Sequence, residues 1–104
     1  MRDETCALVH CLGVGAEEAV PAAALAAELN FAPSRTAERI RELARDANLA
    51  GIAVVAGPNG FYLAGSFEEI RAYEQSLISR AMAILERAKA LATVEPELAG
   101  TFGG

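Results

Sequence analysis

The sequence has no tryptophan and few other aromatic residues, with four phenylalanines and two tyrosines among its 104 residues. Much of its apolar content is alanine, which buries little area per side chain, so we expect a small aliphatic core. A chain of this length has room for one compact domain and an appendage, which excludes a multidomain enzyme. Because 53% of the residues are hydrophobic, the composition also argues against disorder as the main state.

Long apolar stretches are also missing. No run approaches the roughly 20 apolar residues that span a bilayer, and the first four residues, Met-Arg-Asp-Glu, lack the basic-then-apolar order of a signal peptide. We therefore expect a cytoplasmic protein that makes no contact with a membrane.

Cysteine and histidine are too scarce for a metal site. Cys6 and Cys11 are the only cysteines, and on one helix their spacing turns them about 140° apart, which suits no disulfide. His10 is the only histidine, and although it could share a helix face with Cys6, no second pair completes a tetrahedral site. Glycine-rich phosphate loops and paired catalytic carboxylates are missing too. The sequence therefore predicts no metal, no cofactor and no enzymatic activity.

Positive charge is in deficit, because nine lysines and arginines stand against fourteen aspartates and glutamates, a net charge of −5. Taken alone, this balance disfavours nucleic acid, whose phosphates repel an acidic surface. The balance is uneven, however: it is −4 over residues 1–30, +1 over residues 31–66 and −2 over residues 67–104. The middle segment is therefore the candidate for DNA contact, and the acidic first segment is the candidate for contact with a basic protein.

Three short helices are predicted in the first half of the chain. An apolar run followed by glycines indicates a helix from about residue 4 to residue 12. Pro21 suits the first turn of a second helix that ends near Leu29, where Asn30 tolerates the left-handed conformation that closes a helix. A third helix runs from Ser34 to about Ala47. On a helical wheel, the charged residues of the third helix lie opposite an apolar arc of about 120°. That arc contains Ala37, Ile40, Leu43, Ala44 and Ala47.

A β-hairpin is predicted over residues 51–65. Apolar and β-branched residues flank a tight turn, Gly57-Pro58-Asn59-Gly60. Proline fixes φ at the first central position of such a turn, and glycine supplies a positive φ after it. The expected fold class is therefore mainly α with one small β-hairpin.

A long helix should follow the hairpin. Ser66 and Glu69 have the spacing of a capping box, and no glycine or proline interrupts the chain before Pro96. If the helix continues to Val94, it is about 42 Å long. The predicted organisation is thus a first domain over residues 1–65, a long helix over residues 66–94 and a flexible tail over residues 95–104.

The order helix, short helix, tight turn, charged helix and hairpin is that of a winged helix-turn-helix module. The stretch from Leu25 to Leu43 resembles a helix-turn-helix core, and Gly51-Ile52 with Gly60-Phe61-Tyr62-Leu63 resembles a wing. Residues 5 to 65 are similar to the N-terminal domains of the biotin-repressor type and to small stand-alone winged-helix regulators of bacteria and phages. The biotin-repressor ligase domain has no counterpart in the chain.

The resemblance implies that the third helix lies in the major groove of DNA and that the wing lies beside the backbone. The candidate DNA-binding residues are Ser34, Arg35, Thr36, Glu38, Arg39, Arg41 and Arg45 in the third helix and Asn59 and Tyr62 in the wing. The wing itself contains no lysine or arginine, so its contacts would come from backbone amides, Asn59 or the Tyr62 hydroxyl. Alternatively, the arginines form a solvated face of ion pairs three residues apart, such as Arg39 with Glu42 and Glu42 with Arg45.

The long helix carries an apolar stripe with the stagger of a coiled-coil seam. The seam consists of Ile70, Leu77, Ala81, Ile84, Ala88 and Leu91. Phe67 and Ile70 in its first turns are expected to pack on the first domain. A helix of about 42 Å outruns a domain of about 25 to 30 Å, so its far end needs a partner. We therefore expect a homodimer that forms through this helix.

Two functions follow from these observations. The first is a sequence-specific DNA-binding transcriptional regulator of bacterial or phage type that binds double-stranded DNA as a homodimer. The alternative is a winged-helix protein-interaction module, for instance a phage-type inhibitor or adaptor, that presents an acidic surface to a protein partner and does not bind DNA. Salt-dependent binding to duplex DNA distinguishes the two.

Overall fold

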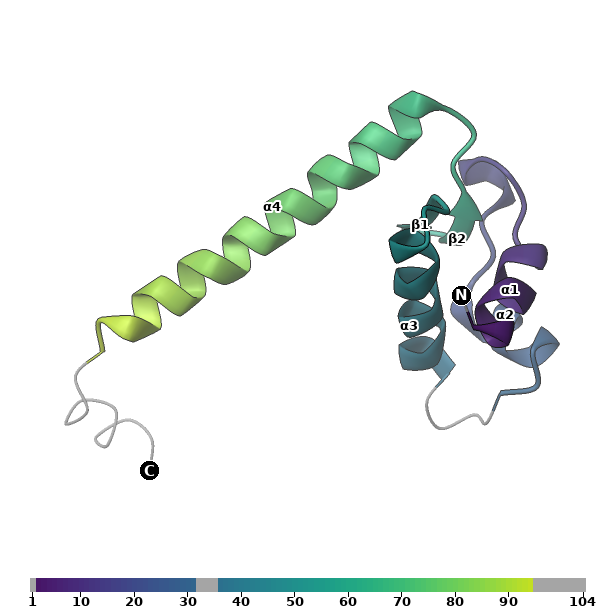
Figure 1. The fold of residues 1–104 in the computed structure, drawn as a ribbon, viewed down its shortest axis with the longest axis horizontal. Coiled ribbons are helices and arrows are strands. Elements are labelled where there is room, and N and C mark those ends of the chain that lie inside the picture. The colour runs from purple at the N-terminus through teal and green to yellow at the C-terminus, as the bar shows by residue number, and fades with distance from the viewer. Residues whose placement is uncertain (1, 32–35, 95–104) are drawn as a thin grey trace. The chain divides into compact units, whose positions relative to one another are not determined.

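The computed structural model describes residues 2–31 and 36–94. Its elements in chain order are α1 (Asp3–His10), η1 (Ala16–Glu18), α2 (Ala22–Glu28), α3 (Thr36–Leu49), β1 (Val54–Gly57), β2 (Gly60–Leu63) and α4 (Phe67–Ala92) (Figure 1). The fold is mainly α with one two-stranded antiparallel hairpin and a long C-terminal helix, as the sequence predicts. The expected flexible tail, residues 95–104, lies outside the described residues.

The internal contacts of the chain divide it into two units, residues 1–71 and residues 72–104. The first unit contains every element up to the hairpin together with the first residues of α4. The rest of α4 belongs to the second unit. Among the described helices, none combines the length and the hydropathy needed to cross a membrane.

Local residue preferences account for the ends of the first helices. Asp3 and Glu4 occupy the first turn of α1, where carboxylates interact favourably with the positive end of the helix dipole. The chain leaves α2 through Asn30, whose φ of 58° is the left-handed conformation that the sequence predicts at this position. The backbone N–H of Phe31 then donates to the carbonyl oxygen of Ala26 at 3.0 Å, which returns the chain toward the core.

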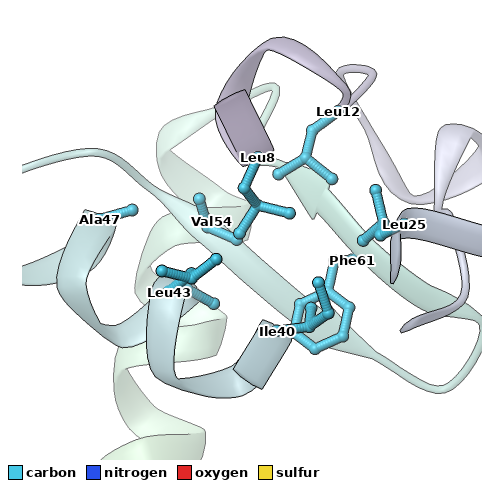
Figure 2. Close-up of a cluster of buried hydrophobic side chains, with 9 residues drawn as sticks. Leu8, Leu12, Leu25, Ile40, Leu43, Ala47, Val54 and Phe61 are labelled. Atoms are coloured by element: carbon cyan, nitrogen blue, oxygen red, sulfur yellow. The ribbon is translucent and has the colours of Figure 1, made fainter. Parts of the chain in front are cut away.

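The core of the first unit is small and mostly aliphatic, close to what the sequence predicts, with Phe61 as an aromatic member. Side chains from α1, α2, α3 and the hairpin converge in it (Figure 2). Its members are Leu8, Leu12, Leu25, Ile40, Leu43, Ala44, Ala47, Val54 and Phe61. Ala37 is exposed, so its predicted place on the buried face is wrong. It lies at the edge of the apolar arc and in the first turn of α3, so the helix turns it away from the other buried residues.

The hairpin pairs Val54 with Leu63 and Gly57 with Gly60. The segment between α1 and α2 adds to the other edge of β2. Val20 and Phe61 exchange two backbone hydrogen bonds of 2.9 Å, and the backbone N–H of Leu63 donates to the carbonyl oxygen of Gly13 at 2.9 Å. The hairpin is therefore tied by its backbone to the helical part of the unit, a connection between distant segments that the sequence did not reveal.

Asn48 fixes the connection from α3 to the hairpin. Its Nδ2 donates to the carbonyl oxygens of Ile52 at 2.9 Å and Val54 at 3.0 Å. Between Asn48 and Ile52 the chain turns through Gly51, whose φ is +88°. The Asn48 amide thus satisfies the carbonyl group of Ile52 in the connection and that of Val54 at the start of β1.

The start of α4 is capped as predicted, since the backbone N–H of Glu69 donates to Ser66 Oγ at 3.2 Å. The helix contains 26 residues, which corresponds to about 39 Å. No residue of α4 is buried, and Phe67 is 78% exposed. The expectation that Phe67 packs on the first domain is therefore wrong, because its side chain is left exposed in the first turn of α4. Ile70 is half-buried.

Candidate functional site

The charged residues of α3 are divided between two faces of the helix. Glu38, Arg41 and Arg45 are exposed and follow one another at spacings of three and four residues, so they lie along one stripe. We call these three residues the exposed stripe. Within residues 2–31 and 36–94, neither Arg41 nor Arg45 forms an ion pair. Both guanidinium groups are therefore available to a ligand.

The second charged face of α3 is engaged by α1. Arg39 donates through Nη2 to Glu4 and through Nη1 to Glu42 Oε2, the latter at 3.1 Å. Arg2 Nη1 donates to the other carboxylate oxygen of Glu42 at 3.1 Å. We call this network between the two helices, which also includes Thr5 and Asp46, the α1–α3 clasp.

Thr5 supplies the buried part of the α1–α3 clasp. Its side chain is fully buried, and its Oγ1 donates to Asp46 Oδ2 at 2.7 Å. The pKa of Asp46 is lowered chiefly by this bond and secondly by the backbone N–H of Arg2. The pKa of Glu42 is lowered by the hydrogen bonds from Arg2 and Arg39. These hydrogen bonds therefore stabilise the ionised forms of Glu42 and Asp46.

The α1–α3 clasp changes the charge of the face that α3 leaves exposed. From Thr36 to Leu49 the helix has three arginines and three acidic residues. Two of those acidic residues accept hydrogen bonds from the N-terminal part of the chain: Glu42 from Arg2, which precedes α1, and Asp46 from Thr5 of α1. The exposed stripe keeps two arginines and one glutamate, so its net charge is +1 although the whole chain is acidic.

The predicted DNA-binding residues of α3 do not all share this stripe. Ser34 and Arg35 lie outside the described residues. Thr36 begins α3 and is half-buried. The side chain of Arg39 is 31% exposed and is held in the α1–α3 clasp, where its hydrogen bonds with Glu4 and Glu42 raise its pKa. Of the predicted ion pairs three residues apart, Arg39 with Glu42 is present, whereas Glu42 takes Arg2 as its second partner.

The two predicted wing residues lie in different environments. Asn59 is exposed in the turn between β1 and β2. Tyr62 is half-buried, and its ring lies so close to Gly57 that a Cβ atom there would be 3.2 Å from Cε1. Asn59 therefore presents its amide to solvent, while Tyr62 combines packing along the hairpin with a hydroxyl group at the edge of its ring.

Sequence reasoning missed the α1–α3 clasp. The wheel places all charges of α3 away from the core, but it does not reveal which of them a neighbouring helix covers. Thr5 was the available signal, because a polar residue that shares a turn with Leu8 needs a partner when both are buried. The partner, Asp46, is 41 residues away, so the signal indicates a contact without identifying it.

The groups outside the exposed stripe that could bind a metal or react include two cysteines and one histidine. No group of three histidine, cysteine or acidic side chains within residues 2–31 and 36–94 could hold a metal. Cys6 and Cys11 are both free thiols, and burial together with Glu28 raises the pKa of Cys11, which disfavours its thiolate. His10 is hydrogen-bonded through Nδ1 to the carbonyl oxygen of Cys6 at 2.8 Å. The exposed stripe is therefore the strongest candidate site, and it is suited to binding.

No protein-family model, no curated protein and no solved structure matches the chain. A functional conclusion must therefore come from the arrangement of the residues themselves. The relevant arrangement is a helix with an exposed pair of arginines beside a hairpin that is fixed to the same unit.

Because the α1–α3 clasp contains two carboxyl groups with lowered pKa values, we expect acid to destabilise the first unit. Folding lowers the pKa of both Glu42 and Asp46, so they stabilise the fold above the ordinary carboxyl pKa of about 4. This stabilisation is lost as the pH falls through the lowered values of the folded state. In urea titrations from pH 7 to pH 3, we expect the parent to lose more stability than the Glu42→Gln/Asp46→Asn variant. Equal losses for the two proteins across this range would contradict a role for the clasp.

Proposed function

We propose that residues 1–65 form a winged helix-turn-helix domain and that the protein is a sequence-specific, DNA-binding transcriptional regulator. In this proposal α3 lies in the major groove and the hairpin lies beside the DNA backbone. The order of α1, α2, α3 and the hairpin supports it, and so does the backbone pairing that holds the hairpin to the same unit as α3.

The observation that carries the proposal is the positive exposed stripe on an otherwise acidic chain. Arg41 and Arg45 are exposed and have no ion-pair partner within the described ranges, so DNA phosphates would not have to displace a carboxylate. Glu38 lies on the same stripe, and a glutamate can accept a hydrogen bond from the amino group of cytosine in the major groove. The stripe therefore combines phosphate contacts with a base-reading group.

Arg39 has a different role in this proposal. Its guanidinium is bonded to Glu4 and Glu42, and DNA could use it only by breaking those bonds. We therefore assign Arg39 to the positioning of α3 against α1, and Arg41 and Arg45 to DNA contact. The proposed contacts with base edges still include Thr36, the first residue of α3, and Ser34 and Arg35, which precede it in the sequence.

The hairpin would contribute hydrogen bonds and no charge. No lysine or arginine occurs between Arg45 and Arg71. The exposed Asn59 amide and the Tyr62 hydroxyl are the polar side-chain groups that the sequence places in the wing. Because few phosphates are neutralised, non-specific affinity should be weak. Two domains joined in a homodimer would then supply the affinity for a two-site operator.

The test is a fluorescence titration of the full-length protein against duplexes enriched from a random pool. Arg41→Ala and Arg45→Ala should each weaken binding and lower the slope of log affinity against log salt by about one. Arg41→Glu/Arg45→Glu should lower affinity roughly 100-fold or more, because two attractive phosphate contacts become repulsive. Arg2→Ala is the matched control, since it removes an arginine of the α1–α3 clasp and should leave the slope unchanged.

Two results would overturn this proposal. One is a parent protein that binds no duplex in a salt-dependent manner. The other is an Arg41→Glu/Arg45→Glu variant that binds as tightly as the parent. If the parent binds no DNA and instead retains one stoichiometric protein partner after nuclease treatment, the chain is a protein-interaction module with an acidic surface.

A further inference from the structure

α4 presents an apolar face that no residue within the ranges 2–31 and 36–94 buries. Between Leu77 and Leu91 the helix exposes six large apolar side chains to an extent of 42% or more. They are Leu77, Ile78, Met82, Ile84, Leu85 and Leu91. Three of them belong to the predicted seam, and Ile78 and Leu85 follow seam residues by one position, which widens the face. A face of this kind on a helix about 39 Å long needs a partner of similar length.

The charges of α4 are distributed unevenly along its length. Residues 67–79 contain three glutamates and one arginine, a net charge of −2. Residues 80–92 contain two arginines, one lysine and one glutamate, a net charge of +2. This polarity follows the preference of each helix end for opposite charge. It also makes one half of the helix electrostatically complementary to the other half.

We propose that the partner of this face is α4 of a second copy, paired in the antiparallel direction. An antiparallel pair places the acidic half of each helix beside the basic half of the other and opposes the two helix dipoles. A parallel pair would instead place like-charged halves side by side. The charge complementarity thus selects both the occupant and its direction.

The residues at matching levels support the antiparallel direction. If the seam overlaps fully from Ile70 to Leu91, Leu77 of one copy lies level with Ile84 of the other. Glu74, which occupies the missing seam position between Ile70 and Leu77, then lies level with Arg87 of the other copy. In a parallel pair the two Glu74 carboxylates would lie level with each other inside the seam, which is destabilising.

The antiparallel dimer has a consequence for the DNA-binding proposal. With full overlap, the two residues at position 67 lie 27 residues apart along the pair, or about 40 Å. Half-sites on one face of DNA are roughly 34 to 36 Å apart, so the start points of the two α4 helices are spaced on the scale of one turn of DNA. In a parallel dimer the same residues would lie about 10 Å apart. The operator spacing rests on the proposed function, whereas the dimer does not.

Disulfide crosslinking of the full-length protein tests the direction. In a Cys6→Ser/Cys11→Ser background, Leu77→Cys and Ile84→Cys are prepared as separate proteins and also mixed. Oxidation of the mixture should give a crosslinked pair that contains one chain of each kind, and each protein alone should give little crosslinking. Positions 77 and 84 would be about 10 Å apart along a parallel pair, beyond the reach of a disulfide. Efficient crosslinking of each protein with itself, and none between the two, would overturn the antiparallel arrangement.

Solution mass tests the surface itself. The parent should be a dimer, and Ile84→Lys should be a monomer at the same concentration. Ser79→Lys carries the same charge change on the opposite side of α4 from the seam and should remain dimeric. A monomeric parent, or an Ile84→Lys variant that stays dimeric, would overturn the proposal. A monomeric parent that binds DNA would leave the proposed function intact, whereas an antiparallel dimer without DNA binding would reject that function alone.

Discussion

Replacing Gly60 by alanine is expected to destabilise the first unit by about 3 kcal/mol or more. The φ of Gly60 is +126°, a conformation that a residue with a Cβ atom adopts only under strain. A Cβ atom there would also collide with the carbonyl group of Val20 and lie 2.7 Å from the nitrogen of Pro21. Because both neighbours are backbone, relief of the collision requires Val20 to move away from the hairpin, which breaks its two hydrogen bonds with Phe61.

Gly51→Ala separates the two contributions to this effect. Gly51 also has a positive φ, +88°, but a Cβ atom there would meet nothing within 4 Å. Its replacement should therefore cost only the backbone strain of about 1 to 2 kcal/mol. Urea denaturation followed by circular dichroism gives both values, and amide hydrogen exchange at Val20 and Phe61 reports the broken pairing. If the two variants lose the same stability, close approach of Val20 is not what requires glycine at position 60.

Gly60 also illustrates how far the hairpin could be predicted. The turn at residues 57–60 follows from local preferences, since proline and glycine have restricted or permissive φ values whatever surrounds them. The close approach of Val20 does not follow, because it joins segments 40 residues apart. The sequence therefore explains Gly60 by the positive φ that the turn needs. The structure adds the close approach of Val20, and this contact accounts for most of the expected loss of stability.

For the helices too, the local features were predicted correctly, whereas the burial of two residues was not. The left-handed Asn30 and the Ser66 cap are local features, and both were predicted from the residues around them. Ala37 and Phe67 were placed in the core because they are apolar and close to buried positions, and both are exposed. Each lies in the first turn of a helix, where the depth of burial depends on how far the neighbouring elements extend. No periodicity in the sequence contains that information.

The sequence identified the charged residues of the candidate site, but it did not show which of them share an exposed surface. A helical wheel separates the charged side of α3 from its apolar side, and this separation is present in the structure. It does not divide the charged side between the α1–α3 clasp and the exposed stripe. That division depends on the placement of α1, which brings Glu4 to Arg39 and Thr5 to Asp46. It removes Arg39 from the proposed DNA contacts and leaves Arg41 and Arg45 among them.

Leu43→Ala is the second substitution with a large expected effect, a loss of about 2 to 5 kcal/mol in the free energy of unfolding. Leu43 is 0% exposed and lies among core residues from α1 and the hairpin (Figure 2). Truncation removes apolar contacts and leaves a cavity, and a core of aliphatic residues has few large side chains that could fill it. Against a typical domain stability of about 5 to 15 kcal/mol, this loss is large.

Leu49→Ala is the matched control, because it makes the same change six residues later in α3 at a side chain that is 84% exposed. Its stability should stay within about 0.5 kcal/mol of the parent. Urea denaturation measures both variants, and similar losses would contradict the assigned burial. Leu43 belongs to the helix that carries Arg41 and Arg45, so any unfolded fraction of Leu43→Ala also lowers the apparent DNA affinity by that fraction. Moderate urea should therefore weaken DNA binding by Leu43→Ala before it weakens binding by Leu49→Ala, if the folded α3 is what contacts DNA.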